Sequence, residues 1–413
     1  MMPKLYPPIQ GKTHHRKVHE KELVELLCEV VLQAGILADP LEIENFYVCI
    51  KSNPMVLLKG PVENGKLDFL RLFAEFIIGE SNHQCQMMVG HPYWASGSKN
   101  VAMFTEAQAR YITEKVICLI EEAWQPENRW KMYLACLAQV SPAEIESFFV
   151  PTAFQLGHGQ IIRLPYAHFT KPIPFPSNLF LVGTMDSDWY HTFGSDLLMS
   201  TAIIDWPEKS KRRYEFSDVG SNSRSGEKVF LQSSIRSEYA ARSKLRRILG
   251  WGMEGLEPIR LIEDLFEIYG YKLSQKVMGQ VMTYLANAWT KEGIGLFAAS
   301  TQSNLLVSLD LAISQYLLPH YVDLLQDNQD LYGNLSRELD DHFPRSREYL
   351  KEHTPQVTNL KAHTDTERMD PVCGMQVDPE MSAGKIEHQG RTYHFCSEGC
   401  LAAFSKNPGN YVN

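Results

Sequence analysis

Three cysteines near the end of the chain are the residues whose types and spacing point most directly to chemistry. Cys373, Cys396 and Cys400 lie within the last 41 residues, whereas the other five cysteines are scattered singly among apolar residues. Thiolates prefer soft or borderline metal ions, notably Zn²⁺ and Cu⁺. Cys396 and Cys400 are four positions apart, so on one helical turn their thiolates would face the same way. With Cys373 on a predicted turn, they indicate a three-thiolate metal site.

The fourth ligand of this site is left open among three side chains, which are His394, His388 and Asp370. We expect His394 to lie on a strand and to point away from the cysteines, so a structural role is its alternative. A unit of about 44 residues has little core of its own, so a bound metal would contribute much of its folding free energy. The alternative to a metal site is a disulfide or three free thiols in a small core.

A second candidate site is the segment GPVENGK at 60–66, which matches the phosphate-loop pattern G-x-x-x-x-G-K. It follows a predicted strand and precedes a predicted helix, the context that this motif needs. Gly60 and Gly65 would let backbone N–H groups turn toward phosphate, and Lys66 would lie near the β- and γ-phosphates of ATP or GTP. The next residue should be Ser or Thr to bind Mg²⁺, but Leu67 cannot ligate a hard cation. The alternative is a glycine turn without a ligand.

The spacing of apolar residues predicts the helices and strands that must position these residues. An apolar run at 54–60 predicts a buried strand, and the runs within 130–140, 178–188 and 199–207 predict further buried parallel strands. Helical spacing returns at 20–36, 44–53 and 67–78, and it dominates from 245 to 325. These patterns predict an α/β nucleotide-binding unit with a parallel sheet and flanking helices, an all-helical region and a small separate unit at the end. The family resemblances given below imply an α/β P-loop module, a small all-helical lid and a small α+β metal-binding domain for these three parts.

The predicted organisation has six parts. They are a flexible tail at 1–19, an α/β core at 20–207, a basic connecting segment at 208–244, a helical lid at 245–340, a polar linker at 341–369 and the cysteine-bearing domain at 370–413. The length of 413 residues suits two to four domains. Apolar residues make up 44% of the chain and charged residues 22%, which excludes a wholly disordered protein.

Charge and targeting signals limit the partners. The net charge of −9 gives no general attraction to nucleic acid or anionic membrane. Residues 208–247 are a local exception, with eleven Lys or Arg against five Asp or Glu, so they are either a weak nucleic-acid contact or a solvated loop. No apolar run is long enough to cross a bilayer, and the N-terminus lacks the apolar core of a secretory signal. We therefore expect a cytoplasmic location.

Residues from about 20 to 325 resemble the AAA+ ATPases of the McrB type. The matching segments are the approach to GPVENGK, IESFFVP (145–151), NLFLVGTMDSDWYHTFGSDLL (178–198) and LDLAISQYLLPHYVDL (309–324). In that family they correspond to the Walker A entry, the segment after the Walker B strand, the sensor-1 strand and a lid helix. The resemblance implies a ring-forming nucleotide-binding module whose partners are other AAA+ ring subunits or an intact relative.

The departures from the family pattern fall on its chemical groups. The acidic pair after the Walker B strand falls on Ala138 and Gln139, and the sensor-1 asparagine falls on Asp186. The Asp-Arg pair that supplies the trans-acting finger falls on Met199 and Ser200. With Leu67, these losses predict a pseudo-ATPase that binds ATP or GTP, if at all, without hydrolysis. The alternative is a different register in which Asp186, Asp188 or Glu144 supplies the missing carboxylate.

The last 44 residues resemble the YHS domain from end to end. The residues that carry the resemblance are Asp370 to Met375, Tyr393 to Ser397, Gly399, Cys400, Phe404, Pro408 and Tyr411. In that family the cysteines are associated with metal, including in modules attached to heavy-metal-transporting P-type ATPases. The sequence therefore predicts a non-hydrolysing AAA+-type assembly or regulatory subunit with a domain that binds Zn or Cu. The alternatives are an active McrB-like NTPase that remodels a partner or nucleic-acid complex, and a metal-responsive adaptor.

Overall fold

The computed structural model forms two compact units, residues Met1–Thr354 and Pro355–Asn413. Within them it describes residues 19–61, 64–79, 83–89, 101–138, 140, 152, 161–162, 173–185, 195–198, 201–206, 226–339, 342–353, 371–372, 377, 382–388, 391–395, 397–406 and 408. The two units are described separately below.

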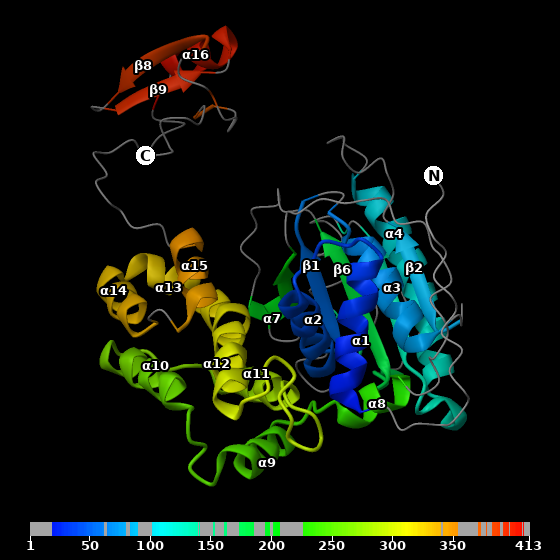
Figure 1. Cartoon of the computed structure of the whole chain (residues 1–413). Coiled ribbons are helices and arrows are strands. Elements are labelled where there is room, and N and C mark those ends of the chain that lie inside the picture. Colours follow the sequence, from blue (N-terminus) through cyan, green and yellow to red (C-terminus); the bar gives the residue numbers. More distant parts are fainter. Residues whose placement is uncertain are drawn as a thin grey trace, which may run out of the picture. The chain divides into compact units, whose positions relative to one another are not determined.

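A five-stranded parallel sheet is the centre of the first unit (Figure 1). Its order is β2 (Cys85–Val89), β3 (Tyr133–Ala138), β6 (Leu179–Met185), β1 (Met55–Lys59) and β7 (Thr201–Asp205). The sequences MVLLK, YLACLA and LFLVGTM are almost continuously apolar because both faces of these strands are buried. The predicted α/β class is confirmed, and the sheet is compatible with a P-loop-like module.

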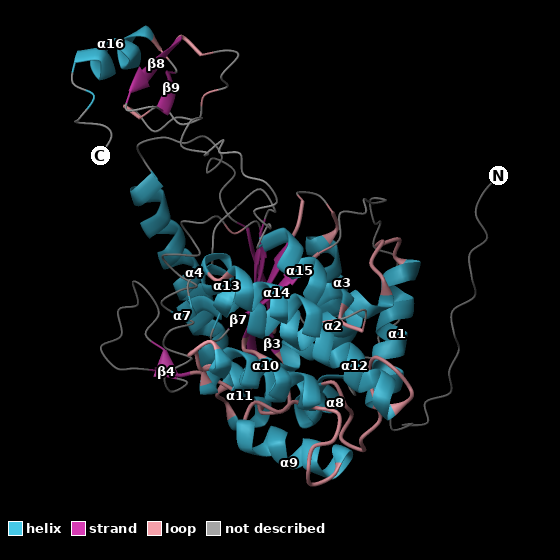
Figure 2. Ribbon diagram, turned by 90° about the vertical axis from the view of Figure 1, so that its left-hand side faces the viewer, coloured by secondary structure: helices cyan, strands magenta, loops and turns pink. Residues whose placement is uncertain are grey.

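Helices cover both faces of the sheet. Val56 and Leu58 of β1 face α1 (Glu20–Gln33), α2 (Pro40–Ser52), α3 (Lys66–Ile78) and α8 (Gly226–Ser233). The alternate residues Met55 and Leu57 face the other side, where α4 (Val101–Ala123) and α7 (Ser195–Leu198) lie (Figure 2). A 3₁₀ turn, Pro126–Asn128, precedes β3, and the short strands β4 (Ile161–Ile162) and β5 (Ile173–Pro174) form a separate antiparallel pair.

A helical segment completes the first unit. Its elements are α9 (Glu238–Leu249), α10 (Glu257–Ile268), α11 (Gln275–Asn287), α12 (Thr301–Ala312), the π-helix η5 (Ile313–Leu317), the 3₁₀ helix η6 (Leu318–Tyr321), α13 (Val322–Asp327), α14 (Gln329–Glu338) and α15 (Pro344–His353). Their buried side chains belong to the same hydrophobic cluster as α1, α2 and α3. The segment is helical as expected, but its action as a lid stays a prediction.

Buried hydrogen bonds fasten α2 to these helices. Tyr284 Oη on α11 donates to Asn45 Oδ1 at 2.6 Å, and Asn53 Nδ2 donates to Tyr316 Oη at 2.6 Å. Asn287 Nδ2 adds a bond of 3.1 Å to Ser52 Oγ. The α/β core and the helical segment therefore meet through a polar seam inside one continuous core.

Helix α15 (Pro344–His353) lies within the range 341–369 that we predicted to be a polar linker. The helix is anchored by Ser346, whose backbone N and Oγ both bond Asp310 Oδ1, at 2.8 and 2.7 Å. Leu350 is also buried. One buried leucine and a polar anchor thus hold a helix whose composition is otherwise polar. Similarly, α8 and the start of α9 occupy part of the predicted connecting segment at 208–244.

The second unit contains the antiparallel hairpin of β8 (Gly384–His388) and β9 (Arg391–Phe395), followed by α16 (Glu398–Lys406). Its small core consists of Tyr393, Phe395 and Phe404. A Cβ added at Gly384 would meet Leu401 Cδ1 at 2.7 Å, so α16 crosses the hairpin closely at this glycine. The predicted α+β character of this domain agrees with these elements.

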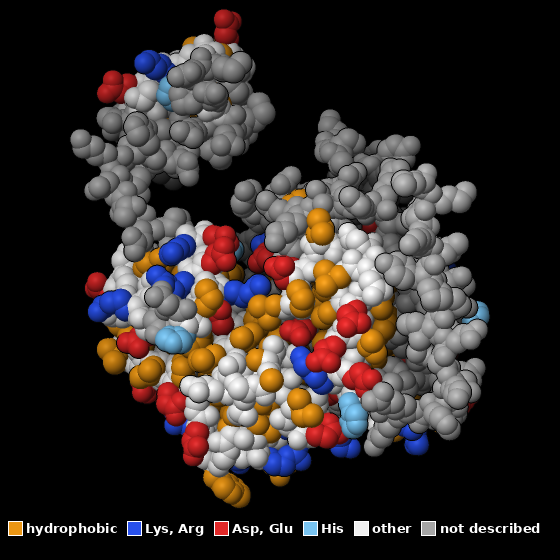
Figure 3. Space-filling view, viewed as in Figure 1, with side chains coloured by type: hydrophobic (Ala, Val, Ile, Leu, Met, Phe, Trp, Pro, Cys, Tyr) orange, Lys and Arg blue, Asp and Glu red, His pale blue; other side chains and the backbone are white. Residues whose placement is uncertain are grey.

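Surface composition and helix length bear on two further expectations. On the face shown in Figure 3, basic and acidic side chains are interspersed. Across the described ranges, no helix combines the length and apolar character that crossing a membrane requires.

Candidate functional sites

The predicted phosphate loop lies at the carboxyl edge of the sheet, between β1 and α3. Gly60 N donates to Met185 O at the end of β6, at 3.2 Å, and Trp206 N, just after β7, donates to Lys59 O at 2.6 Å. The loop therefore starts between the ends of two neighbouring strands, where α/β sheets commonly bind ligands. Gly65 precedes α3 with φ of +84°, a conformation that glycine adopts without strain.

Lys66 turns its ammonium group back onto its own loop. Its Nζ donates to Gly60 O at 2.5 Å and to Pro61 O at 2.6 Å, and its side chain is buried. In a phosphate loop the lysine would instead contact the β- and γ-phosphates. A phosphate group would therefore have to replace contacts that the loop already makes.

The loop is also closely packed. A Cβ added at Gly60 would lie 2.6 Å from both Asn64 Nδ2 and Trp206 O. Asn64 Nδ2 donates to Trp206 O at 3.4 Å, and the Trp206 ring lies against Phe69 of α3 with centroids 4.5 Å apart. The two motif glycines thus permit a tight turn, and a nucleotide fits here only if the Lys66 contacts open.

Two of the positions expected to have lost catalytic groups lie in described segments. Leu67 is the second residue of α3 and is half-buried, and Ala138 ends β3 with a buried methyl group. Neither side chain can bind Mg²⁺ or activate water. Gln139, Asp186, Met199 and Ser200 lie outside the described residues.

The carboxylate of Asp205, at the end of β7, forms an ion pair with Lys59, with Nζ and Oδ1 2.8 Å apart. This pair joins β1, from which the loop continues, to its neighbour β7, because Lys59 ends β1 and pairs with Asp205 in the sheet. Asp205 is thus engaged with a neighbouring strand.

Of the three cysteines predicted to bind metal, Cys400 is the one that the structure describes. It lies in the first turn of α16, where its backbone N donates to Ser397 Oγ at 3.3 Å, and it is half-buried against the small core. The start of a helix favours negative charge, and thus a thiolate. Cys373 and Cys396 lie outside the described residues, as does Asp370. Because α16 begins at Glu398, Cys396 precedes the helix by two positions in the sequence.

The two histidines considered as the fourth ligand differ in position. His394 alternates with the core residues Tyr393 and Phe395, so it lies on the hairpin face opposite α16, and its Nδ1 is 3.3 Å from Ser382 Oγ. His388 lies on the same hairpin face as the core, and its ring meets Phe404 edge-on at 6.0 Å. The described parts of the chain contain no cluster of three His, Cys, Asp or Glu side chains placed to hold a metal.

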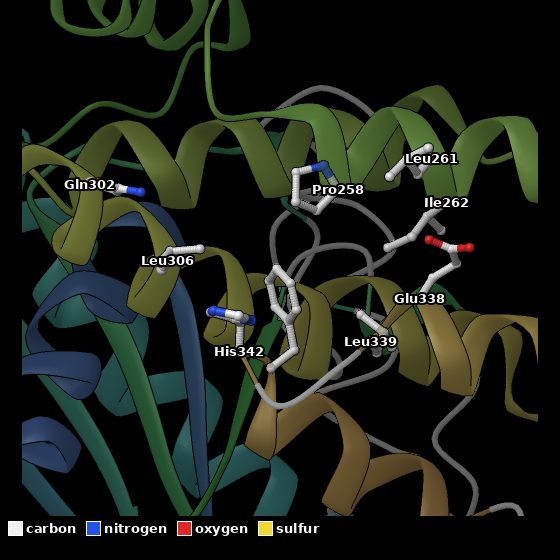
Figure 4. Close-up of a pocket in the computed structure, with 9 residues that line it drawn as sticks. Pro258, Leu261, Ile262, Gln302, Leu306, Glu338, Leu339 and His342 are labelled. Carbon is white, nitrogen blue, oxygen red and sulfur yellow. The ribbon is translucent and has the colours of Figure 1, made fainter.

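Sequence reasoning missed a hollow of about 390 Å³ in the helical segment. Figure 4 shows side chains of α10, α12 and the end of α14 around it. The lining is mainly apolar, with Leu261, Ile262, Leu306 and Phe343 among its members, and Glu338 and His342 add polar atoms. Such a lining suits a small apolar group. The spacing of single helices gives no signal of it, because three separate helices contribute.

The comparisons with known proteins concern the second unit. Residues 369–413 match the YHS domain family. A stretch of 43 residues is 49% identical to a copper-transporting P-type ATPase of Rhizobium leguminosarum bv. viciae. The match covers 10% of this chain and 5% of that ATPase, so the likeness is confined to one small domain. The expected YHS domain is thereby confirmed, and it supports a metal-related role.

Proposed function

We propose that this protein is a regulatory or assembly subunit that binds a soft metal through its YHS domain and carries a P-loop-like module that does not hydrolyse nucleotide. The observation that carries the proposal is the YHS match over 369–413, which includes all three clustered cysteines.

The metal would be held by Cys373, Cys396 and Cys400. Three sulfur donors suit Cu⁺ or Zn²⁺, and the similarity to a copper-transporting ATPase supports copper. Cys400 lies at the start of α16 and against the Tyr393, Phe395 and Phe404 core, so a metal there would be coupled to the packing of helix on hairpin. When bound, the metal supplies a cross-link among segments that bury little apolar surface. The opposite-face position of His394 supports a structural role for that histidine.

Three features of the first unit support a module without hydrolysis. Lys66 bonds the carbonyl groups of its own loop, Leu67 offers no hydroxyl to Mg²⁺, and Ala138 offers no carboxylate at the end of β3. Phosphoryl transfer requires a metal ligand and a water-activating group, and the loss of either one removes a required part. The module then acts through binding, and its partners are AAA+ ring subunits or an intact relative of the McrB type.

The test of the metal proposal uses the full chain, prepared without metal under reducing conditions and titrated with Zn²⁺ or with Cu⁺. The triple variant Cys373→Ser, Cys396→Ser, Cys400→Ser should bind one equivalent less of each ion than the unchanged chain. Cys118→Ser is the matched control, because this exposed cysteine lies on α4 in the other unit. Metal content by mass spectrometry gives the equivalents. A triple variant that binds as much metal as the unchanged chain would defeat the assignment.

A further inference from the structure

Two cysteines that are far apart in the sequence meet at the edge of the sheet. Strands β2 and β3 are parallel neighbours, with Met87 opposite Cys136 and Cys85 opposite Leu134. Residues two apart on a strand share a face, so Cys85 and Met87 lie on one face of β2. Cys136 lies on the same side of β3, since all three contact the same hydrophobic cluster. Their sulfur atoms therefore gather on one face of the sheet.

Two of these sulfur atoms lie close together. Cys85 Sγ lies 3.9 Å from Met87 Sδ. The neighbouring Cys136 thiol holds the pKa of the Cys85 thiol below its ordinary value despite burial. Burial and the Cys85 thiol raise the pKa of Cys136.

Two of the three side chains are partly exposed. Strand β2 is an edge strand of the sheet, and Cys85 and Met87 are half-buried, whereas Cys136 is fully buried. Glu227 of α8 accepts hydrogen bonds from Gln84 Nε2 at 3.2 Å and from Met132 N at 3.0 Å, and it thereby fixes the chain just before each strand. The sulfurs are therefore held by rigid elements, as a metal site requires.

The geometry favours a metal over a disulfide. Both cysteines are free thiols. Cys85 and Cys136 are offset by two residues across neighbouring strands, so their Cα atoms are roughly 8 Å apart, from a strand spacing of ~4.8 Å and a rise of ~3.3 Å per residue. A disulfide needs Cα atoms within about 7 Å. A metal ion with bonds of about 2.3 Å to each sulfur does not require the two Cα atoms to lie that close together.

We propose that Cys85, Met87 and Cys136 form a second soft-metal site, which binds Cu⁺ in preference to Zn²⁺. Two thiolates and a thioether are donors that select Cu⁺, whereas Zn²⁺ sites in proteins use thiolate, imidazole and carboxylate donors. The site is separate from the YHS cysteines, and the inference does not depend on the function proposed for them.

The experiment uses the full chain with Cys373, Cys396 and Cys400 replaced by Ser, so that Cu⁺ bound to the tail does not contribute. Cu⁺ is titrated against a chromophoric Cu⁺ chelator under anaerobic, reducing conditions. This background should bind one equivalent of Cu⁺ and no stoichiometric Zn²⁺. Adding Cys85→Ser or Cys136→Ser should abolish Cu⁺ binding, and Met87→Leu, which conserves volume, should weaken it at least tenfold.

Cys118→Ser in the same background is the matched control and should leave Cu⁺ affinity unchanged. If Cys136→Ser prevents folding, Cys85→Ser and Met87→Leu at the half-buried edge strand still decide the question, because circular dichroism can check that each is folded. A background chain that binds no Cu⁺ would overturn the proposal, and so would equal Cu⁺ affinity in the Cys85 and Met87 variants. A disulfide between Cys85 and Cys136 found by mass spectrometry after anaerobic purification would also overturn it.

Discussion

Replacing Lys51 by Met should destabilise the first unit strongly, because Lys51 belongs to a fully buried ion pair. Its Nζ lies 2.5 Å from Glu20 Oε1, and the two side chains are 0% and 3% exposed. Nζ also donates to Asn287 O at 3.1 Å, and Glu20 Oε1 accepts a hydrogen bond from Ser233 Oγ at 2.8 Å. Burial lowers the pKa of Lys51, and Glu20 counters that effect. The pair therefore joins α1, α2, α8 and α11.

The magnitude follows from what remains after the substitution. Lys51→Met leaves the Glu20 carboxylate buried without its ion-pair partner, which costs about 3–5 kcal/mol in comparable sites. Ser233 still donates to Glu20, so the lower end, about 3 kcal/mol, is the expectation. At roughly 2.1 cal/mol/K per residue over about 330 residues, the unfolding entropy is roughly 0.7 kcal/mol/K. The melting temperature should therefore fall by roughly 4 °C.

Calorimetry and urea unfolding of the full chain measure this loss. Arg242→Met is the control, because Arg242 pairs with Glu238 on the surface of α9, with Nε and Oε1 2.7 Å apart, and exposed pairs of this kind contribute less than about 1 kcal/mol. The double variant Glu20→Gln, Lys51→Met should lose less stability than the sum of the single variants, since no unpaired charge remains. A Lys51→Met loss no greater than that of the control would refute the reasoning.

Three further predictions concern the phosphate loop and one buried amine. Phosphate release from ATP or GTP should stay well below ~1 s⁻¹. Leu67→Thr should not restore hydrolysis, because a hydroxyl at position 67 supplies no water-activating group. A turnover near 1 s⁻¹ that Lys66→Ala abolishes would contradict this prediction. If the loop opens to bind nucleotide, ATP at ten times its dissociation constant should raise the free energy of unfolding by about 1.4 kcal/mol. The increase should be the same with Mg²⁺ and with EDTA. An unchanged melting curve at millimolar ATP would identify the loop as a turn without a ligand. Burial lowers the pKa of Lys244 to about 7, and its Nζ donates a hydrogen bond to Trp289 O. Between about pH 7 and 10.5 the unfolded chain therefore binds more protons than the folded chain. The free energy of unfolding should rise with pH in that window. Lys244→Met should reduce this rise in urea titrations at pH 7 and 9, and equal slopes for both proteins would count against the assignment.

The central sheet could be predicted in large part from the sequence, because four of its strands are apolar runs whose two faces are both buried. Strand β2 was missed, since Gln86 interrupts a short run that forms an edge strand. Helix α15 was missed for a similar reason, as its anchor is the bond between Ser346 and Asp310 rather than an apolar stripe. The pattern of apolar residues in a segment indicates a strand when both faces of that strand are buried. It gives no indication when a single contact with a residue distant in the sequence holds the element in place.

The candidate sites show the same limit. The sequence predicted a glycine turn followed by a helix at 67–78, and the structure confirms it with α3, which begins at Lys66. It did not predict that Nζ bonds the carbonyl groups of Gly60 and Pro61, because residue types do not specify how a loop closes. Cys85 and Cys136 looked like isolated buried thiols, since only the register of β2 on β3 brings them together.

The polar seam between α2 and the helical segment bears on how this protein could transmit a signal. Molecular motors turn a change of bound ligand into rotation of one domain about a hinge, and a hinge needs an interface that can slide or open. Here Asn45 bonds Tyr284, and Asn53 bonds Tyr316, within one uninterrupted apolar interior. Opening that interface would expose buried amides and hydroxyls that have lost their partners. Any rotation of the helical segment against the α/β core would therefore have to break these hydrogen bonds and separate the apolar side chains around them.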